Sequence, residues 1–501
     1  MHERIVRART TAGTVEGFTR DGVNRWRSIP YARPPVGPLR YRAPQPAQPW
    51  SGVRHCHGFA NCAPQQRRYT LLGVGRYQPM SEDCLTLNVV TPEASPAEPL
   101  PVMVFIHGGG YILGSSATPL YDGAALARRG CVYVSVNYRL GALGCLDLSS
   151  LSTPDITIDG NLYLQDLVLA LGWIKDNIAG FGGDPDNVTI FGESAGAHIT
   201  ATLLAVPAAA GLFHRAISES PAAGMTRSQE LAAEFATRFA HLLGARSQDA
   251  ASAVMRASAS QLIDTQHRLI DQGMQQRLGA FPIGPVFGDE VVPIDPVEAM
   301  RSGQAHRVPL IVGTNADEGR LFTRFLGMLP TNEAMVEALL SDLEPEARQR
   351  ITAAYPKYPN QSACIQLGGD FAFSSAAWQI AEAHGIHAPT YLYRYDYAPR
   401  TLQWSGFGAT HATELFAVFD IYRTRFGALL TAAADQRAAL RVSNEVQRRW
   451  RSFSRTGVPG DDWPVYTHAD RAVMVIDRKT RVEFDPQKDR RLAWDGFSLA
   501  R

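Results

Sequence analysis

Short apolar runs of strand length recur along the chain and alternate with stretches of helical spacing. The runs lie at residues 85–90, 102–106, 131–136, 188–191, 216–218, 309–312, 391–395 and 472–476. Residues 161–178 instead place Leu164, Leu167, Leu171 and Ile174 at helical spacing. This alternation predicts an α/β fold with a large, mainly parallel twisted sheet flanked by helices. In such sheets ligands bind beyond the carboxyl ends of the strands.

The regions outside this alternation have a different pattern. Residues 5–10 and 14–18 flank a short turn and predict a hairpin, and residues 30–49 form a Pro-rich loop. Residues 225–390 contain further segments whose apolar residues have helical spacing, for example 228–243 and 332–355. These segments predict helical insertions that cover the sheet. No Gly/Ser-rich linker separates folding units, so we expect residues 1–501 to form a single domain.

A serine sits where a predicted strand turns sharply into a predicted helix. The strand at 188–191 is followed by Gly192-Glu193-Ser194-Ala195-Gly196, and a predicted helix begins near Ala195. In this strand–turn–helix context the Gly-x-Ser-x-Gly pattern indicates a nucleophilic serine, with the glycines making room for a tight turn. The turn would expose the Ser194 hydroxyl at a helix N-terminus, where backbone N–H groups favour developing negative charge.

A glycine-rich loop follows the strand predicted at residues 102–106. It reads His107-Gly108-Gly109-Gly110, and glycines let a backbone approach an oxyanion and aim N–H groups at it. No Gly-Lys-Ser/Thr follows, which argues against a phosphate-binding loop. We therefore expect the N–H groups of Gly109, Gly110 and Ala195 to form an oxyanion hole, with His107 in a structural role.

A serine nucleophile needs a base, and the base needs an acid that fixes its tautomer. His411 lies in a glycine-flanked loop after the strand at 391–395, where a base is expected, whereas His198 is one turn along the helix that follows Ser194. Asp317 and Glu318 both follow the strand at 309–312. The pattern alone leaves the choice between these two acids open.

Several motifs together resemble the type-B carboxylesterases, the family of carboxylesterases, cholinesterases and bacterial para-nitrobenzyl esterases. They cover nearly the whole chain and include Ser28–Ala32, Ser81–Asn88, Val136–Arg139, Phe181–Pro185, the turn at Ser194, Asp317–Gly319 and the loop around His411. The resemblance implies an α/β-hydrolase fold and a serine esterase that works through an acyl-enzyme, without metal or cofactor. A catalytically silent binding module, or a serine amidase or lipase, is the alternative on the same fold.

The resemblance also assigns roles to individual residues. It implies that Glu318 is the acid and His411 the base, and that Ser220 supports them by hydrogen bonding. Glu193 matches a buried acid beside the catalytic residues, although a simple core ion pair is an equal interpretation. The family's ion pairs match Arg40 with Glu82 and Arg139 with Asp166. No Trp occurs in the loop at residues 63–83, where cholinesterases carry a choline-binding Trp, so choline esters are not expected to be preferred.

The cysteines and a nearby histidine pair allow other interpretations. Six cysteines are too few for a disulfide scaffold in 501 residues. Cys62 and Cys84 match the family's first disulfide, yet in a reducing cytosol they would be free thiols. His55-Cys56-His57 followed by Cys62 fits no standard zinc-ligand spacing, so we expect no metal.

Composition and charge exclude some partners. Lys+Arg number 49 and Asp+Glu 48, a net charge of +1, which excludes overall steering toward nucleic acid or an anionic membrane. No apolar run approaches the ~20 residues of a membrane span, and the N-terminus has no secretory signal pattern, so we expect a cytoplasmic location. The expected partner is a small, uncharged, fairly apolar ester, selected by the helical insertions and by loops around Leu113, Leu326 and Trp404. The sequence carries no signal for the oligomeric state.

Overall fold

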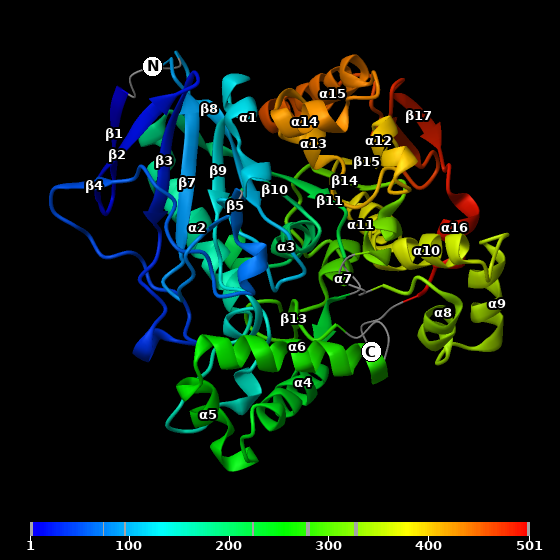
Figure 1. The fold of residues 1–501 in the computed structure, drawn as a ribbon, viewed down its shortest axis with the longest axis horizontal. Helices are drawn as coiled ribbons and strands as arrows, with labels where there is room; N and C mark the ends of the chain where they lie inside the picture. Colours follow the sequence, from blue (N-terminus) through cyan, green and yellow to red (C-terminus); the bar gives the residue numbers. More distant parts are fainter. Residues whose placement is uncertain are drawn as a thin grey trace.

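A large twisted sheet runs through the molecule (Figure 1). The computed structural model describes residues 4–73, 75–94, 97–222, 225–276, 281–324 and 329–497. Within these ranges the main sheet has 13 strands in the order β1-β2-β3-β7-β9-β8-β10-β11-β14-β15-β16-β17, with β4 paired to β2. The strands are β1 (Arg4–Thr10), β2 (Gly13–Arg20), β3 (Val23–Pro30), β4 (Val53–His55), β7 (Thr86–Pro92), β8 (Leu100–Ile106), β9 (Val132–Val136), β10 (Gly183–Glu193), β11 (Arg215–Glu219), β14 (Leu310–Asn315), β15 (Thr390–Tyr395), β16 (Ala472–Ile476) and β17 (Arg481–Phe484).

The central part of this sheet is parallel and its two ends are antiparallel. Strands β9, β8, β10, β11, β14, β15 and β16 pair in parallel. The N-terminal hairpin β1–β2, the β3–β7–β9 pairings and the last pair β16–β17 are antiparallel. The parallel centre predicted from the alternating sequence is therefore confirmed. It aligns the carboxyl ends of β8, β10, β11, β14 and β15 along one edge.

Helices cover both faces of the sheet, because alternate residues of each buried strand face opposite sides. On β8, Val104 and Ile106 belong to one apolar core and Phe105 to the other. Helices α2, α3 and α11 pack on the first face, and α1, α13 and α15 on the second. The helices of the described ranges are α1 (Ala124–Arg128), α2 (Leu162–Asn177), α3 (Ala195–Leu203), α4 (Gln229–Leu242), α5 (Ala250–Arg256), α6 (Ala259–Gln276), α7 (Pro296–Arg301), α8 (Glu333–Leu340), α9 (Pro345–Ala353), α10 (Gln361–Gly369), α11 (Ser375–His384), α12 (Arg400–Trp404), α13 (Leu415–Val418), α14 (Arg425–Leu430), α15 (Gln436–Thr456) and α16 (Lys488–Ala493).

The longest helix shows how the sequence places a buried face. Along α15, Val442, Val446, Trp450 and Phe453 recur at helical spacing and are all buried against the sheet. The helix ends at Gly457, whose φ of 81° is the left-handed conformation that glycine adopts without steric cost. In Figure 1, α13 to α15 lie at the top of the view and α4 to α6 at the bottom. Every helix of the described residues is too short or too polar to cross a membrane.

Several predicted elements have different bounds in the structure. The helical segment predicted at 332–355 forms two helices, α8 and α9. Pro345 lacks a backbone N–H, so it begins a helix instead of continuing one. Strand β10 begins at Gly183, earlier than the apolar run at 188–191 indicated, and it pairs through Glu193. The apolar pattern marks only the buried half of this strand, since residues 184–187 are more exposed.

Two ion pairs expected from the family motifs form in the structure. Arg139 and Asp166 are 4% and 0% exposed, and Arg139 Nη2 lies 2.6 Å from Asp166 Oδ1. Arg139 also donates to the carbonyl of Arg42 at 2.8 Å, which ties the Pro-rich loop to α2. Arg40 Nε lies 2.9 Å from Glu82 Oε2. The Arg139–Asp166 pair is the more deeply buried of the two. Because water does not solvate its charges, each charge is compensated by the other.

We expect Asp166→Ala to destabilise the protein strongly, because it leaves the Arg139 guanidinium buried without its counter-charge. The expected loss is about 3–5 kcal/mol in the free energy of unfolding. Denaturant titration followed by tryptophan fluorescence measures it. Glu298→Ala is the matched control, because its ion pair with Arg301 is 54% exposed on both sides and should contribute no more than about 0.5 kcal/mol. Equal losses in the two variants would contradict the assigned role of burial.

Candidate active site

Ser194 occupies a strained turn between β10 and α3. Its φ of 60° and ψ of −124° lie where non-glycine residues are uncommon. The backbone N–H of Ser194 donates to the carbonyl of Glu219 at 2.9 Å, which fixes the turn against β11. A Cβ at Gly192 would lie 2.5 Å from the carbonyl oxygen of Ile106 at the end of β8, and one at Gly196 would clash with the same atom. Both glycines are therefore required for the close approach of β8 to this turn.

His411 and Glu318 are joined by a short hydrogen bond. Nδ1 of His411 lies 2.6 Å from Oε2 of Glu318, and both side chains are buried. Glu318 follows β14, and its other oxygen accepts hydrogen bonds from the Asn315 N–H at 2.7 Å and the Ser220 hydroxyl at 2.6 Å. The carboxylate is thus held from three sides, and it fixes the orientation of the imidazole ring.

Asp317, the other acid that the sequence left open, takes no part in this contact. Its Oδ1 pairs with Arg320 at 2.8 Å, and its Oδ2 accepts from the Ala409 N–H at 3.2 Å. Asp317 lies in the turn after β14 and Glu318 begins the short 3-10 helix that follows, so the backbone directs the two carboxylates to different partners.

The second ring nitrogen of His411 faces Glu193. Nε2 lies 3.1 Å from Oε1 of Glu193, and neither atom has a well-aligned hydrogen bond among the described residues. Within the same described ranges, the Ser194 hydroxyl makes no hydrogen bond to His411. The structure therefore brings His411 together with Glu318 and Glu193, while Ser194 follows directly in the chain from Glu193.

Two aromatic rings and a set of acids surround the His411 imidazole. Phe373 stacks on it at 4.3 Å between ring centroids, and Phe322 lies at 5.3 Å. Burial alone disfavours the imidazolium, but the nearby charges of Glu193 and Glu318 outweigh it and raise the pKa of His411 above its usual value. The site thus favours a positive charge on this ring.

Two further glutamates complete the acidic cluster and were missed in the sequence analysis. Glu414 binds the Asn315 amide at 2.5 Å and the Ser220 hydroxyl at 3.2 Å. Glu219 accepts from the Trp450 indole N–H at 2.7 Å. Burial raises the pKa of both carboxyls, which favours their neutral forms. Glu414 stands three residues after His411, but no local pattern distinguishes it from a surface acid.

The glycine loop after β8 lies against the Ser194 turn. A Cβ at Gly108 would lie 3.0 Å from the Cβ of Ser194, and Gly109 and Gly110 have φ values of 117° and 57°. Among the described residues, the N–H groups of Gly109 and Gly110 donate to no backbone or side-chain acceptor. Ala195 begins α3, where a helix leaves its first N–H groups without internal partners. These three donors lie on the two segments that meet at Ser194.

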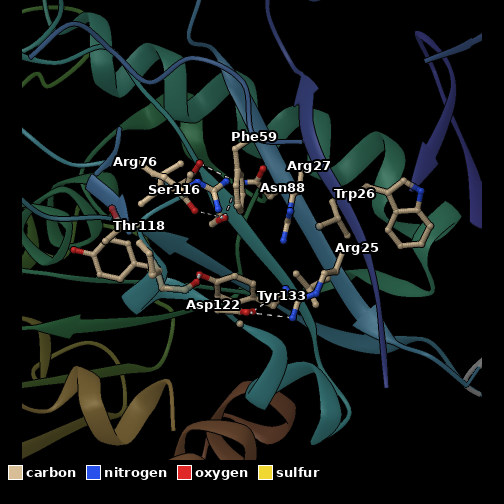
Figure 2. A pocket seen from close by; sticks show the side chains of 18 residues that line it. Arg25, Trp26, Arg27, Phe59, Arg76, Asn88, Ser116, Thr118, Asp122 and Tyr133 are labelled. Atoms are coloured by element: carbon tan, nitrogen blue, oxygen red, sulfur yellow. Dashed lines mark hydrogen bonds and ion pairs between the residues drawn. The ribbon is translucent and has the colours of Figure 1, made fainter. Parts of the chain in front are cut away.

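Two cavities are lined by described residues, and Ser194 lines neither of them. One of about 290 Å³ is lined by β3, β7, β9 and residues 116–123, with the Arg25–Asp122 ion pair on its wall (Figure 2). The other, of about 430 Å³, lies behind Glu318 and reaches Arg324 and Gln366. Of the expected specificity positions, Trp404 is 74% exposed, Leu113 is partly buried and Leu326 lies outside the described residues.

Cys62 and Cys84 are not joined in the structure. Both are buried free thiols, and Cys62 Sγ lies 3.5 Å from the carbonyl oxygen of Pro79. Burial raises the pKa of the Cys62 thiol to about 11, so it is protonated and unreactive at neutral pH. The two thiols are not joined in this structure, and the disulfide implied by the family resemblance and its free-thiol alternative both stay predictions.

Comparison with known proteins places the chain among esterases. The model of the Carboxylesterase family matches residues 2–494. The para-nitrobenzyl esterase of Bacillus subtilis (strain 168) is 36% identical over 489 residues, covering 96% of this chain and 97% of that protein. The phenmedipham hydrolase of Pseudarthrobacter oxydans is 33% identical over 484 residues, covering 94% of each. A solved PNB esterase structure superposes with a TM-score of 0.87 at 34% identity, covering 97% of this chain and 99% of that one. The α/β-hydrolase fold predicted from the sequence is confirmed.

Proposed function

The chain belongs to the carboxylesterase family and is a carboxylic-ester hydrolase, and from that premise we propose that it cleaves small, fairly apolar esters through an acyl-enzyme on Ser194. His411 is the general base, and Glu318 orients it. The observation that carries this proposal is the 2.6 Å contact between His411 Nδ1 and Glu318 Oε2. It leaves Nε2 as the free nitrogen of the base, on the side of the ring nearest the Ser194 turn.

In the first half of the reaction, the Ser194 hydroxyl attacks the ester carbonyl. Its proton passes to Nε2 of His411, and Glu318 stabilises the imidazolium that forms. The carbonyl oxygen becomes an oxyanion, which accepts hydrogen bonds from the N–H groups of Gly109, Gly110 and Ala195. Each such donor is worth roughly 3 kcal/mol of barrier. The imidazolium then protonates the departing alcohol, and water releases the acid by the same steps.

Glu193 tunes the base rather than holding the substrate. Its carboxylate lies 3.1 Å from Nε2 of His411, so it competes with Ser194 for that nitrogen in the free enzyme. Burial raises the pKa of the Glu193 carboxyl to about 7, and its ionised form favours the imidazolium that forms during the attack. Ester binding desolvates the site and orders Ser194. His411 Nε2 would then exchange its contact with Glu193 for a hydrogen bond with the Ser194 hydroxyl. Apo sites commonly have such loose contacts, which tighten when substrate binds.

The surroundings of His411 support an uncharged, apolar substrate. Phe322 and Phe373 form apolar walls beside the base. The buried carboxyl groups of Glu193 and Glu318 lie beside the base, so a carboxylate-bearing ester would bring a further buried charge into the site without a positive partner from them. Neutral esters with small acyl groups avoid this cost.

We expect Ser194→Ala to lower kcat for short para-nitrophenyl esters by on the order of 10⁵ to 10⁶ while the protein stays folded. The hydroxyl oxygen is the only heavy atom that the substitution removes. The circular dichroism spectrum and the melting temperature of the variant should therefore match those of the parent. An organophosphate probe should label the parent at one equivalent and the variant not at all. Hydrolysis near the parental rate would show that another residue is the nucleophile.

We expect Glu318→Gln to lower kcat by on the order of 10⁴, because an amide cannot stabilise the imidazolium and favours the wrong tautomer. Asp317→Asn is the matched control, since Asp317 contacts Arg320 and not His411. It should change kcat by less than about tenfold. Steady-state kinetics of the two variants gives the ranking, and the reverse ranking would mean that Asp317 is the acid.

We expect Glu193→Gln to move the acid limb of the pH profile of kcat/KM to lower pH. That limb reports the pKa of the base in the free enzyme. The charge of Glu193 raises the pKa of His411, so its removal lowers that pKa and keeps the base neutral at lower pH. An opposite charge at this distance shifts such a limb by about one pH unit or more. Asp317→Asn should leave the limb in place. An unmoved or raised limb in Glu193→Gln would contradict the tuning role.

A further inference from the structure

Two histidines and one glutamate converge on the N-terminal part of the sheet, at the left of Figure 1. Strand β4 pairs in parallel with the first half of β2, and His55 is the register partner of Glu16. The chain then continues alongside β2, because the Cys56 N–H donates to the Glu16 carbonyl at 2.7 Å. Side chains two residues apart on an extended segment share a face. His57 is therefore presented on the same side as His55, toward Glu16.

The distances among these side chains fit a metal ion. Oε1 of Glu16 lies 2.8 Å from Nδ1 of His55 and 3.6 Å from Nε2 of His57, and one donor atom from each residue lies within 4.8 Å of the others. With Zn–N and Zn–O bonds of roughly 2.0–2.2 Å, the edges of a tetrahedral site are about 3.3 Å long. Both measured distances to Oε1 differ from that edge by only a few tenths of an ångström. Closing the site requires the two imidazole nitrogens, which lie within 4.8 Å of each other, to approach that edge as well.

The His57 ring has a polar atom that nothing in the fold uses. Nε2 of His57 is inaccessible to solvent and has no hydrogen-bond partner among the described residues. The ring is held edge-on by Phe18 and His55, at 5.9 and 5.8 Å between ring centroids. A buried imidazole nitrogen without a partner costs free energy unless a ligand satisfies it. A metal bound between Nε2 and Oε1 would do so.

Glu16 is prepared to act as an anionic ligand. It is 5% exposed, and its Oε2 is paired with Arg7 at 2.8 Å, while Oε1 is the oxygen that faces the histidines. The Arg7 Nε also donates to Oε2 at 2.9 Å, so the guanidinium holds the outer oxygen of this carboxylate. A partner on the outer oxygen that orients the ligating carboxylate is common in protein metal sites.

We propose that Glu16, His55 and His57 bind one divalent transition-metal ion of the zinc class, with water in the fourth position. Two imidazoles and one carboxylate favour Zn²⁺, Co²⁺, Ni²⁺ or Cu²⁺ over Mg²⁺ and Ca²⁺, which prefer oxygen ligands alone. His55 binds through Nδ1, so metal binding replaces its 2.8 Å hydrogen bond to Glu16 Oε1 and leaves the imidazole proton on Nε2. The side chain of His55 is 72% exposed, which leaves an entry path for the ion.

The role of this site is structural. It would fasten the three-residue strand β4 and the chain that follows it to β2, in a part of the sheet that contains none of the proposed catalytic residues. A ligand that binds only the folded state raises the melting temperature by mass action. The ion should therefore stabilise the protein without changing ester hydrolysis.

The test is a zinc titration of the full-length, chelator-stripped protein by calorimetry, with His55→Ala, His57→Ala and the double variant alongside. The parent should bind one more equivalent of Zn²⁺ than the double variant, and each single substitution should weaken that binding by at least about tenfold. Zn²⁺ should raise the melting temperature of the parent but not that of the double variant. His241→Ala is the matched control, because this exposed histidine lies on α4 and should leave zinc binding unchanged.

Co²⁺ provides a second, independent measurement. Bound at a tetrahedral site, it should give an intense visible absorption band in the parent that is lost in both single variants and retained in His241→Ala. Equal zinc stoichiometry and affinity in the parent and the double variant would overturn the proposal. So would a parent melting temperature that Zn²⁺ does not raise. Parental rates of ester hydrolysis in all variants would show that the substitutions act on this site alone.

Discussion

The close approach of two backbones, at the ends of β8 and β10, is the constraint on which the proposed active site depends. The carbonyl of Ile106 leaves no room for a side chain at Gly192 or Gly196. Because of this contact, the glycine loop that follows β8 lies against Ser194, and a Cβ at Gly108 would be 3.0 Å from the serine Cβ. The proposed nucleophile and the proposed oxyanion donors therefore follow neighbouring parallel strands, and the sheet sets their relative position.

The second organising feature is the placement of one buried imidazole among four buried glutamates. Four negative charges in this space would repel one another strongly, and burial favours the neutral forms of Glu219 and Glu414. Ser220 and Asn315 connect Glu318 to Glu414 by hydrogen bonds, so a proton shared within the cluster has defined positions. The cluster can thus stabilise the imidazolium during catalysis while carrying little net charge at rest, which limits its cost to stability.

Local pattern was sufficient where the chemistry is encoded within a few consecutive residues, and insufficient where it is shared between strands. The Ser194 turn and the glycine loop could be predicted because each depends on adjacent residues, and the parallel sheet because strand-length apolar runs alternate with segments of helical spacing. The choice of Glu318 over Asp317 required the family resemblance, since only the folded backbone decides which carboxylate faces His411. Glu219, Glu414 and Phe373 were missed because only the fold brings them together with the other acids or against the His411 ring, from β11, from the turn after His411 and from the segment before α11.

The same limit explains why the histidine pair before Cys62 predicted no metal site. Judged as a local motif, His55 and His57 lacked two further ligands at any standard spacing. The carboxylate that completes the set is supplied by Glu16, nearly forty positions earlier, through the register of β2 against β4. That carboxylate also balances a positively charged neighbourhood, because Arg7 pairs with it and Arg27 donates to the His57 carbonyl at 3.3 Å. A divalent ion there adds positive charge, so the site depends on the Glu16 carboxylate, whose orientation is fixed by the pairing with Arg7.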